Sequence, residues 1–564
     1  MSDPTSKFTE PEFAAGAARP ADADVVIVGN GALGLFLADE LLERQAGSVV
    51  VVGPSHRDTG ASHAAGAMLG CFGETTAESL RTEAARTRFE LGVTAHDKWP
   101  EALRRLQEFA PSNRPLQTAT ESHIILNSIG AELDNVNFAA MIDALDQYEK
   151  PWTEIDPNDI PGYRPRTEQR ALRAIHLPTE GAVDARGVLA ALERRLRQRG
   201  AIFIDQTVRK LIGSDEEVTA VELDDGHRIE AGNVVVAAGV HSESLVRTVL
   251  DVPELMPIFP GLGFAMIARR TEGEPFTSVV RTPNRGFACG LHVVPQGDGL
   301  EYYGATNRLV HTISSVTWMA DVRFLAQYSM HQLDEAVATH EVVNWCSGNR
   351  PVTLDGFPTI GWMPVSGLYL MTGTYRDGFH CAPLLAEHVA NELQGKSGII
   401  DPIFQPMRKP VATRTVEGSI DEYVEHSLAA WFETGAQAAP QMTTSQIADY
   451  YRTMAVRIYE QLGTDYALGP DILLYAQGNL HGARRVARYL RTAGSAGEAA
   501  RRAGVGTGAG GSSSHDRHST VSRGQRPPAR ARSARHHRPR TPPGRGSPAV
   551  GHDLLDLPGP DAVH

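Results

Sequence analysis

Short runs of branched apolar residues recur along residues 23–408 and alternate with segments of helical periodicity. These runs read VVIVG, SVVVVG, AIFIDQ, NVVVAAG and LYLMTG. Continuous apolar runs of this length are typical of strands that are buried on both faces of a parallel sheet. We therefore expect an α/β fold in which strands 24–28 and 48–52 flank a helix that begins near Ala32.

Helical periodicity is clearest in two places. In EGAVDARGVLAAL, Asp184 is expected to cap a helix whose buried stripe is Val188, Leu189, Leu192 and Leu196. Residues 415–495 read as a small helical extension, in which a cap at Thr443 to Ser445 precedes apolar residues at three- and four-residue steps: Ile447, Tyr451, Met454, Ile458 and Leu462. A further helix is expected in YAQGNLHGARRVARYLR. The pattern assigns the extension no chemistry, and packing on the main body, self-association and contact with a protein partner are equally open.

Both ends of the chain have the composition of disordered segments. Residues 1–22 lack the basic start and apolar core of a secretion signal, so we interpret them as a disordered leader. Residues 496–564 contain eleven arginines and no lysine, and they have too few apolar residues to offset the entropy of ordering. We interpret this tail as a non-functional extension. Contact with RNA, DNA or an acidic partner is one alternative, and a frameshifted terminus is another.

Composition narrows the class of protein. A chain of 564 residues is expected to form more than one lobe, and no apolar run approaches the roughly 18 to 20 residues that cross a bilayer. We therefore expect a cytoplasmic protein. The net charge is −13 although the tail is basic, so the main body is acidic and is not expected to bind nucleic acid. Four widely spaced cysteines without a CxxC pair argue against a disulfide framework and a zinc site.

A glycine motif at the start of the first helix indicates a phosphate-binding turn. Gly29, Gly31 and Gly34 form GxGxxG directly after a strand, which is the context of a dinucleotide-binding βαβ unit. The first glycine permits the tight turn, the second admits a pyrophosphate, and the third lets the helix pack closely on the strand. A structural glycine turn is the alternative.

One part of that motif is missing. The second strand of such a unit usually ends in an acid that binds the adenosine ribose, but SVVVVGPSHRD has Gly53 and Pro54 there. Ribose binding is therefore expected from Ser55, His56, backbone groups or water.

Six further fragments, in order along the chain, resemble the D-amino-acid oxidase superfamily of FAD enzymes. They are GASHAAGAMLGCFGE (60–74), EGAVDARGVLAAL (180–192), NVVVAAGVHSESL (233–245), VVPQGDGLEYYGATN (293–307), NRPVTLDGFPTIG (349–361) and GTYRDGFHCAPLLAEHVANEL (373–393). Within the superfamily they look most like glycine oxidase of the thiamine-biosynthesis type and sarcosine oxidase-like enzymes.

The resemblance implies a particular fold and cofactor. The fold is α/β (α+β overall), with a discontinuous Rossmann-like FAD-binding domain over 23–75, 160–250 and 345–400 and an antiparallel-sheet substrate domain over 76–160 and 251–345. The FAD-contacting positions it implies are Gly29, Gly31, Ala32, Leu33, Gly34, Gly60, Ala61, Ser62, His63, Ala65, Gly66, Met68, Val208, Ala238, Gly239, Gly373, Tyr375, Arg376, Asp377, Gly378 and Phe379. Noncovalent binding is expected. A covalent link through His63 is the alternative, because SHAAG resembles dimethylglycine and sarcosine dehydrogenases, which carry their flavin covalently on a histidine preceding AAG.

The resemblance also implies how a substrate is held. Arg350 in NRP corresponds to the clamp for a substrate carboxylate, and Arg376 faces both cofactor and substrate. His292 and Asn307 stand where glycine oxidase has a tyrosine and a methionine, so the pocket is expected to be more polar. His292 either contacts the substrate or only satisfies a neighbouring group.

Together these features predict an FAD-dependent oxidoreductase that converts the C–N bond of a small amino acid or amine to an imine and passes electrons to O2 or another acceptor. Glycine, sarcosine and D-amino acids are the expected type of substrate. One alternative is a biosynthetic amine oxidase with a larger polar substrate. Another is a non-catalytic flavoprotein that acts through the helical extension.

Overall fold

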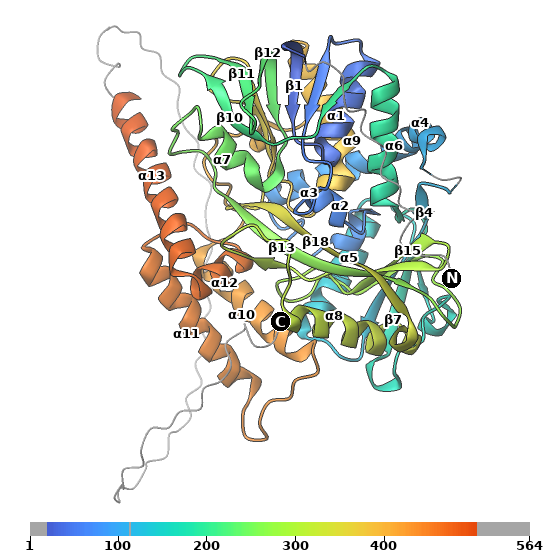
Figure 1. The fold of residues 1–564 in the computed structure, drawn as a ribbon. Helices are drawn as coiled ribbons and strands as arrows, with labels where there is room; N and C mark the ends of the chain where they lie inside the picture. Colours follow the sequence, from blue (N-terminus) through green and yellow to red (C-terminus); the bar gives the residue numbers. More distant parts are fainter. Residues whose placement is uncertain (1–19, 112–113, 505–564) are drawn as a thin grey trace, which may run out of the picture.

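The computed structural model describes residues 20–111 and 114–504, of which 493–504 are described as helical backbone only (Figure 1). Most of the expected disordered leader and tail lies outside these residues. The first strand already begins at Asp22, and the last helix continues to Gly504, past the point where the tail was expected to start.

The first sheet has eight strands and a parallel centre. Strand β1 (Asp22–Val28) lies between β2 (Val49–Val52) and β12 (Arg228–Val236), and both pairings are parallel. The sheet is extended in parallel by β9 (Ile202–Ile204) and β20 (Leu368–Thr372), and in antiparallel by β10 (Val208–Gly213), β11 (Val218–Leu223) and β19 (Thr359–Trp362). The predicted βαβ unit is confirmed.

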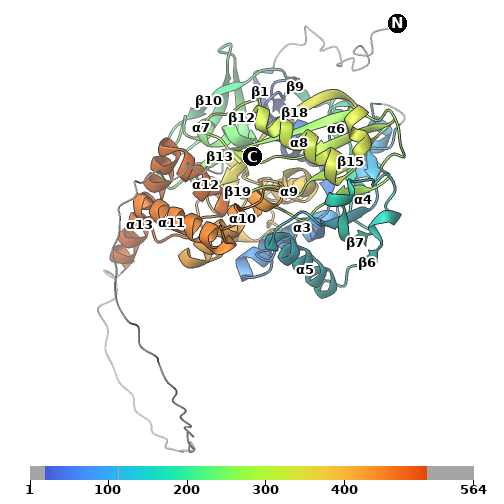
Figure 2. The same ribbon diagram turned by 90° about the horizontal axis from the view of Figure 1, so that it is seen from below.

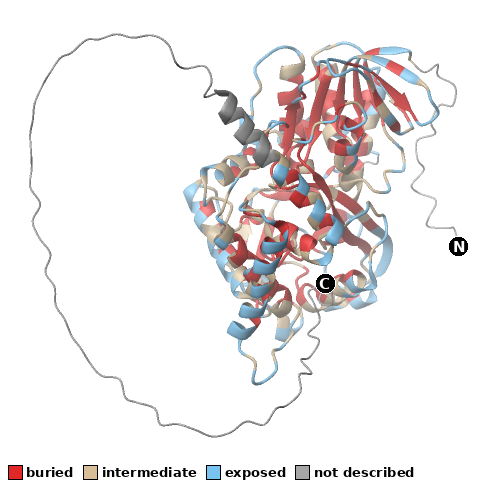
Figure 3. Cartoon of the chain, turned by 90° about the vertical axis from the view of Figure 1, so that its left-hand side faces the viewer, coloured by how far each residue is buried: buried red, intermediate tan, exposed pale blue. Residues whose placement is uncertain are grey.

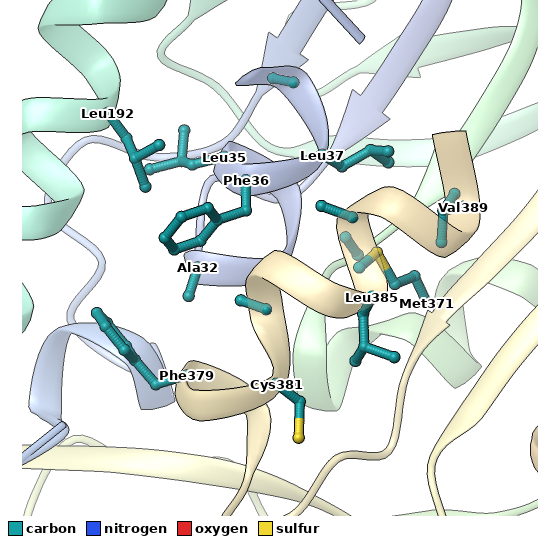
Figure 4. Close-up of a cluster of buried hydrophobic side chains, with 14 of the residues drawn as sticks. Ala32, Leu35, Phe36, Leu37, Leu192, Met371, Phe379, Cys381, Leu385 and Val389 are labelled. Atoms are coloured by element: carbon teal, nitrogen blue, oxygen red, sulfur yellow. The ribbon is translucent and has the colours of Figure 1, made fainter. Parts of the chain in front are cut away.

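Three helices form the main core with this sheet: α1 (Ala32–Glu43), α6 (Ala185–Gln198) and α9 (Gly378–Leu393). Leu35 and Phe36 of α1 lie between Leu192 of α6 and Leu385 of α9, and all four are essentially excluded from solvent (Figure 4). The predicted cap of α6 is confirmed, because the Asp184 carboxylate accepts a hydrogen bond from the Arg186 amide at 3.1 Å. The predicted stripe of α6 is buried as expected.

The second sheet is mostly antiparallel. Its order is β17 (Arg308–Leu309), β13 (Ile258–Arg269), β16 (Leu300–Gly304), β15 (His292–Gly297), β14 (Val279–Arg281), β5 (Ser122–Asn127), β7 (Ala171–Leu177) and β6 (Thr153–Ile155), and β18 (Glu341–Thr353) pairs with β13. Strand β7 belongs here although the sequence placed residues 160–250 with the cofactor domain, because it pairs with β5 along its length. A small third sheet joins β3 (Met68–Leu69), β8 (Gly181–Val183) and β4 (Gln117–Ala119).

Most of the remaining helices of the main body lie around these sheets (Figure 2). They are α2 (Ala61–Ala64), α3 (Glu83–His96), α4 (Trp99–Leu106), α5 (Glu132–Gln147), α7 (Ser242–Val246) and α8 (Met319–Gln332). No helix in the described part of the chain is both long and apolar enough to cross a membrane.

The helical extension contains α10 (Val416–Phe432), α11 (Thr444–Leu462), α12 (Pro470–Gly478) and α13 (Leu480–Gly504). The predicted cap of α11 is confirmed, since Thr443 forms a capping box with Gln446. In its predicted stripe only Met454 is not fully buried. The helices pack on one side of the main body and keep their outer faces exposed (Figure 3). Contact of the extension with the main body, one of the open alternatives, is therefore observed.

Candidate active site

A cavity of about 780 Å³ is lined by residues of both large sheets. One part of its wall comes from the β1–α1 turn, α2 and the loop after α2, and another from the ends of β10 and β12. The second sheet contributes residues of β13, β15, β16 and β18, and the loop before α9 closes the wall. Segments far apart in the sequence therefore form one site.

Glycine is required at two positions of the β1–α1 turn. Gly29 has a φ of +121°, and a Cβ there would lie 2.3 Å from the Ala237 carbonyl oxygen. A Cβ at Gly34 would lie 2.0 Å from the Gly29 carbonyl oxygen, so the predicted close packing of helix and strand is observed. The N-cap residue Gly31 has no side chain to cap the helix, and the hydroxyl of the distant Ser62 accepts from the Ala32 amide at 3.0 Å instead. This helix terminus borders the cavity, as a phosphate-binding terminus does.

Nearly all residues predicted to contact the cofactor lie in the cavity wall. Gly34 and Gly373 are the exceptions. Gly34 packs the helix on the strand, and Gly373 has a φ of +75° where a Cβ would lie 2.7 Å from the Thr353 methyl carbon. Both glycines shape the backbone behind the wall. The others line the cavity: Gly29, Gly31, Ala32, Leu33, Gly60, Ala61, Ser62, His63, Ala65, Gly66, Met68, Val208, Ala238, Gly239, Tyr375, Arg376, Asp377, Gly378 and Phe379.

The residues expected at the ribose are placed differently. The Ser55 amide and hydroxyl donate to Asp205 at 2.7 and 3.0 Å, and neither Ser55 nor His56 lines the cavity. Arg57 lines it instead, with its Nε donating to the Asn30 carbonyl at 3.0 Å and its Nη2 paired with Glu193. Burial lowers the pKa of Arg57 to about 10, so the group keeps its charge at neutral pH.

His63 lines the cavity as a neutral imidazole. Burial, and then the nearby charges of Arg186 and Arg57, lower the pKa of His63 to about 4. Its backbone carbonyl accepts from Arg186 at 3.2 Å. This environment leaves the ring uncharged at neutral pH.

Arg350 lies on β18 directly opposite Gly261 of β13. Its Nη1 donates to the Thr306 carbonyl at 3.2 Å and to Asn307 Oδ1 at 3.4 Å. Both acceptors are uncharged, and within residues 20–111 and 114–492 the guanidinium forms no ion pair. A partly buried guanidinium that borders a cavity without a carboxylate partner is suited to binding an anion.

Tyr375 and Arg376 form the adjacent part of the wall. Tyr375 has a φ of +51°, which is rare for a bulky residue. Its hydroxyl donates to Asp471 at 2.5 Å and accepts from Asn307 at 2.7 Å and from Arg376 at 3.1 Å. The Arg376 guanidinium lies 4.8 Å from the Tyr375 ring centre, and its buried Nε has no hydrogen-bond partner among the described residues.

Asn307 lies behind the cavity wall and connects its parts. The Asn307 amide nitrogen donates to the Phe287 carbonyl at 3.0 Å and to the Tyr375 hydroxyl at 2.7 Å. Its oxygen accepts from Arg350. The structure therefore brings Asn307 to the predicted site, but in contact with other wall residues and not with the cavity itself.

His292 lines the cavity and is neutral. Its Nδ1 lies 2.8 Å from the Gly290 carbonyl, which only accepts hydrogen bonds, so Nδ1 carries the proton and Nε2 is an acceptor. Burial and the nearby Arg281 lower the pKa of His292 to about 4. Such a ring accepts a hydrogen bond but is too weak a base to deprotonate an ammonium group at neutral pH.

A buried ion pair was not predicted at the site. Arg281 donates to Glu74, which lines the cavity, and also to Asn284 at 2.9 Å. Although burial raises the pKa of Glu74, the Arg281 charge opposes this effect and the net result is a pKa of about 2. The charge of Arg281 is thus compensated, in contrast to Arg350. Glu74 ends the quoted fragment GASHAAGAMLGCFGE, but nothing in its spacing marked it as part of the site.

An α/β sheet with a glycine-rich turn at the start of its first helix, next to a large cavity, is the arrangement of a dinucleotide-binding fold. Residues 24–392 match the family described as FAD dependent oxidoreductase, and the chain belongs to that family. Its cofactor is FAD, for which noncovalent binding is the usual mode in this family.

Relatives agree with this membership. Glycine oxidase of Geobacillus kaustophilus is 25% identical over 389 residues, which cover 67% of this chain and 94% of that protein. The bifunctional protein ThiO/ThiG of Synechocystis sp. is 27% identical over 395 residues, which cover 68% of this chain but only 54% of that relative. The match therefore spans about half the length of the bifunctional protein.

A crystal structure of the Geobacillus kaustophilus glycine oxidase shares the fold. It superposes with a TM-score of 0.58 at 22% identity, and the match covers 69% of this chain and 99% of that chain. Helices α10–α13 lie outside the family match, which ends at residue 392.

Proposed function

We propose that this protein oxidises the C–N bond of a small amino acid or secondary amine to an imine. The observation that carries the proposal is the guanidinium of Arg350, which borders the cavity and contacts only uncharged oxygens. A substrate carboxylate supplies the missing countercharge and offers two acceptors to the planar group. Relatives named glycine oxidase and D-amino acid dehydrogenase support this substrate class.

The residues of the chain orient the substrate and do not transfer its protons. Arg350 and Arg376 hold the carboxylate, and this fixes the neighbouring α-carbon and amine. In this proposal the neutral His292 ring accepts a hydrogen bond from the amine through Nε2, and because its pKa is about 4 the substrate reacts as the free amine. When FAD is bound, it supplies the acceptor for the hydride of the α-carbon.

The first experiment tests the carboxylate clamp. We expect the flavin of the purified protein to be reduced, and so to lose its colour, under anaerobic conditions with at least one member of a panel of glycine, sarcosine and D-amino acids. Arg350→Ala should raise KM by roughly ten- to a hundredfold, because a charge-assisted hydrogen bond contributes about 1.5–3 kcal/mol. Arg104→Ala, at an exposed position of α4, is the control and should leave KM unchanged. An unchanged KM in Arg350→Ala would exclude the clamp.

The same assay separates the alternatives. A biosynthetic oxidase for a larger polar substrate would bleach with extended amines and not with glycine. In a non-catalytic flavoprotein, no amine of the panel would reduce the flavin, so the flavin colour would persist. Peroxide release in air identifies O2 as the electron acceptor, whereas turnover only with a dye identifies a dehydrogenase. Acid precipitation distinguishes the flavin linkage, since noncovalent FAD should stay in the supernatant.

A further inference from the structure

Tyr375 of the cavity wall and Phe287 behind it have left-handed backbones although neither is glycine. Tyr375 has a φ of +51° and Phe287 a φ of +57°. Bulky residues adopt this conformation only where surrounding contacts hold them, and such positions concentrate at functional sites. The contacts that hold these two residues therefore matter for the geometry of the site.

Both residues are held by side chains of the helical extension. His426 of α10 accepts a hydrogen bond from the Phe287 amide at 2.9 Å. Asp471, in the first turn of α12, accepts from the Tyr375 hydroxyl at 2.5 Å. Neither His426 nor Asp471 lines the cavity, so both act from behind its wall.

Asn307 couples these two contacts to the arginine. Its amide nitrogen donates to the Phe287 carbonyl and to the Tyr375 hydroxyl, and its oxygen accepts from Arg350. Arg376 donates to the same Tyr375 hydroxyl at 3.1 Å. A continuous set of hydrogen bonds thus runs from Asp471 through Tyr375 to both guanidinium groups that border the cavity.

Apolar packing keeps the extension in this position. Tyr475 of α12 packs edge-on against Phe259 of β13 at 5.3 Å between ring centres, and Tyr423 of α10 packs against Phe287 at 5.9 Å. Arg485 of α13 also pairs with Glu243 of the main body. The extension is therefore built into the main body.

We propose that helices α10–α13 support the active site from behind its wall, and that Asp471 is a positioning residue that sets the substrate-binding orientation of Arg350 and Arg376 through Tyr375 and Asn307. This inference rests on the proposed function for its ligand class, an amine with a carboxylate. The glycine oxidase match covers 99% of that chain and 69% of this one, so we assign this control to the added segment of the present chain.

The test uses carboxylate binding to the flavin-loaded full chain and does not need turnover. Acetate and benzoate are titrated while the visible flavin spectrum is recorded, and the dissociation constants are compared between variants. Asp471→Ala should weaken binding by about tenfold or more, since the Tyr375 hydroxyl loses its acceptor. Asp471→Asn retains an acceptor oxygen and should restore binding to within about threefold of the wild type.

A double-mutant cycle distinguishes positioning from a general structural effect. Tyr375→Phe removes the shared hydroxyl, so we expect Asp471→Ala combined with Tyr375→Phe to bind carboxylates no more weakly than Tyr375→Phe alone. Additive losses, or normal binding in Asp471→Ala, would overturn the proposal. Should Asp471→Ala fail to fold, normal carboxylate binding in Tyr375→Phe would overturn it equally.

Controls keep this result apart from the proposed function. Asp421→Ala removes an acid of α10 that pairs with Arg452 of α11, away from the cavity, and should leave carboxylate affinity unchanged. If no amine is oxidised but Asp471→Ala still weakens carboxylate binding, the proposed function fails and the positioning role stands. If amines are oxidised and Asp471→Ala changes neither KM nor carboxylate affinity, the proposed function stands and the positioning role fails.

Discussion

A methyl group added at Gly263 should displace the arginine that we assign to the substrate carboxylate. Gly263 lies on β13 beneath the Arg350 side chain, and its backbone is one that alanine adopts without strain. A Cβ at this position would lie 2.2 Å from Nη1, 2.5 Å from Nη2 and 2.6 Å from Cζ of Arg350. Ordinary contacts begin near 3.5 Å, so the guanidinium has to move by about 1 Å or more.

The expected cost follows from the geometry of the carboxylate contact. A displacement of this size breaks at least one charge-assisted hydrogen bond, whose contribution is about 1.5–3 kcal/mol. Since about 1.4 kcal/mol corresponds to a factor of ten, KM should rise by roughly ten- to a hundredfold. The folded state should persist, because the atoms that must move are the end of a flexible side chain.

The assay is anaerobic flavin reduction over a range of substrate concentrations, with flavin content and melting temperature recorded for each variant. Gly418→Ala is the matched control, since it lies in the first turn of α10 with its nearest atom, the Thr415 hydroxyl, at 3.3 Å. It should leave KM unchanged. A Gly263→Ala protein with full flavin content and wild-type KM would refute our assignment of Arg350.

Three further predictions concern the cofactor, the extension and pH. Gly29→Ala should abolish FAD retention, measured as absorbance near 450 nm per protein, because its Cβ would overlap the Ala237 carbonyl. Leu473→Ala should lower the unfolding free energy by about 2–5 kcal/mol, measured by denaturant titration, whereas exposed Leu480→Ala should change it by less than about 0.5 kcal/mol. Burial lowers the pKa of His292 to about 4 and that of His426 to about 3, so both rings stay neutral in the folded protein at pH values where the unfolded chain binds protons. The free energy of unfolding should therefore fall as the pH drops below about 6.5, by up to about 1.4 kcal/mol per pH unit for each ring. His292→Gln should flatten this decline, measured as the melting temperature against pH.

The fold was predictable where local pattern and burial agree. Continuous valine runs gave the parallel strands, and the Asp184 and Thr443 caps fell where the sequence indicated. The sequence placed residues of strand β7 with the cofactor domain, although β7 belongs to the second sheet. Pairing between strands far apart in the sequence leaves no local signal that would have shown this. The sequence likewise gives no local signal for the part of the main body on which helix α13 packs.

The candidate site was only partly predictable. Positions that require glycine, such as Gly29, and the arginine in NRP carry a recognisable pattern. Asp471 carries none, since an acid in the first turn of a helix is explained by its favourable interaction with the helix dipole alone. Its contact with Tyr375 depends on how the extension docks, and that information is distributed over many apolar residues.

The late position of α12 in the chain affects synthesis as well as the finished protein. The turn at Gly29 leaves the ribosome early, whereas Asp471 follows more than four hundred residues later. At about 5–20 residues per second, the 96 residues from Tyr375 to Asp471 take roughly 5 to 20 seconds, and during this time Tyr375 is still without its acceptor. A ribosome that stops between residues 393 and 470 therefore releases a polypeptide that has the whole family-matched segment but lacks the acceptor that completes its arginine cluster.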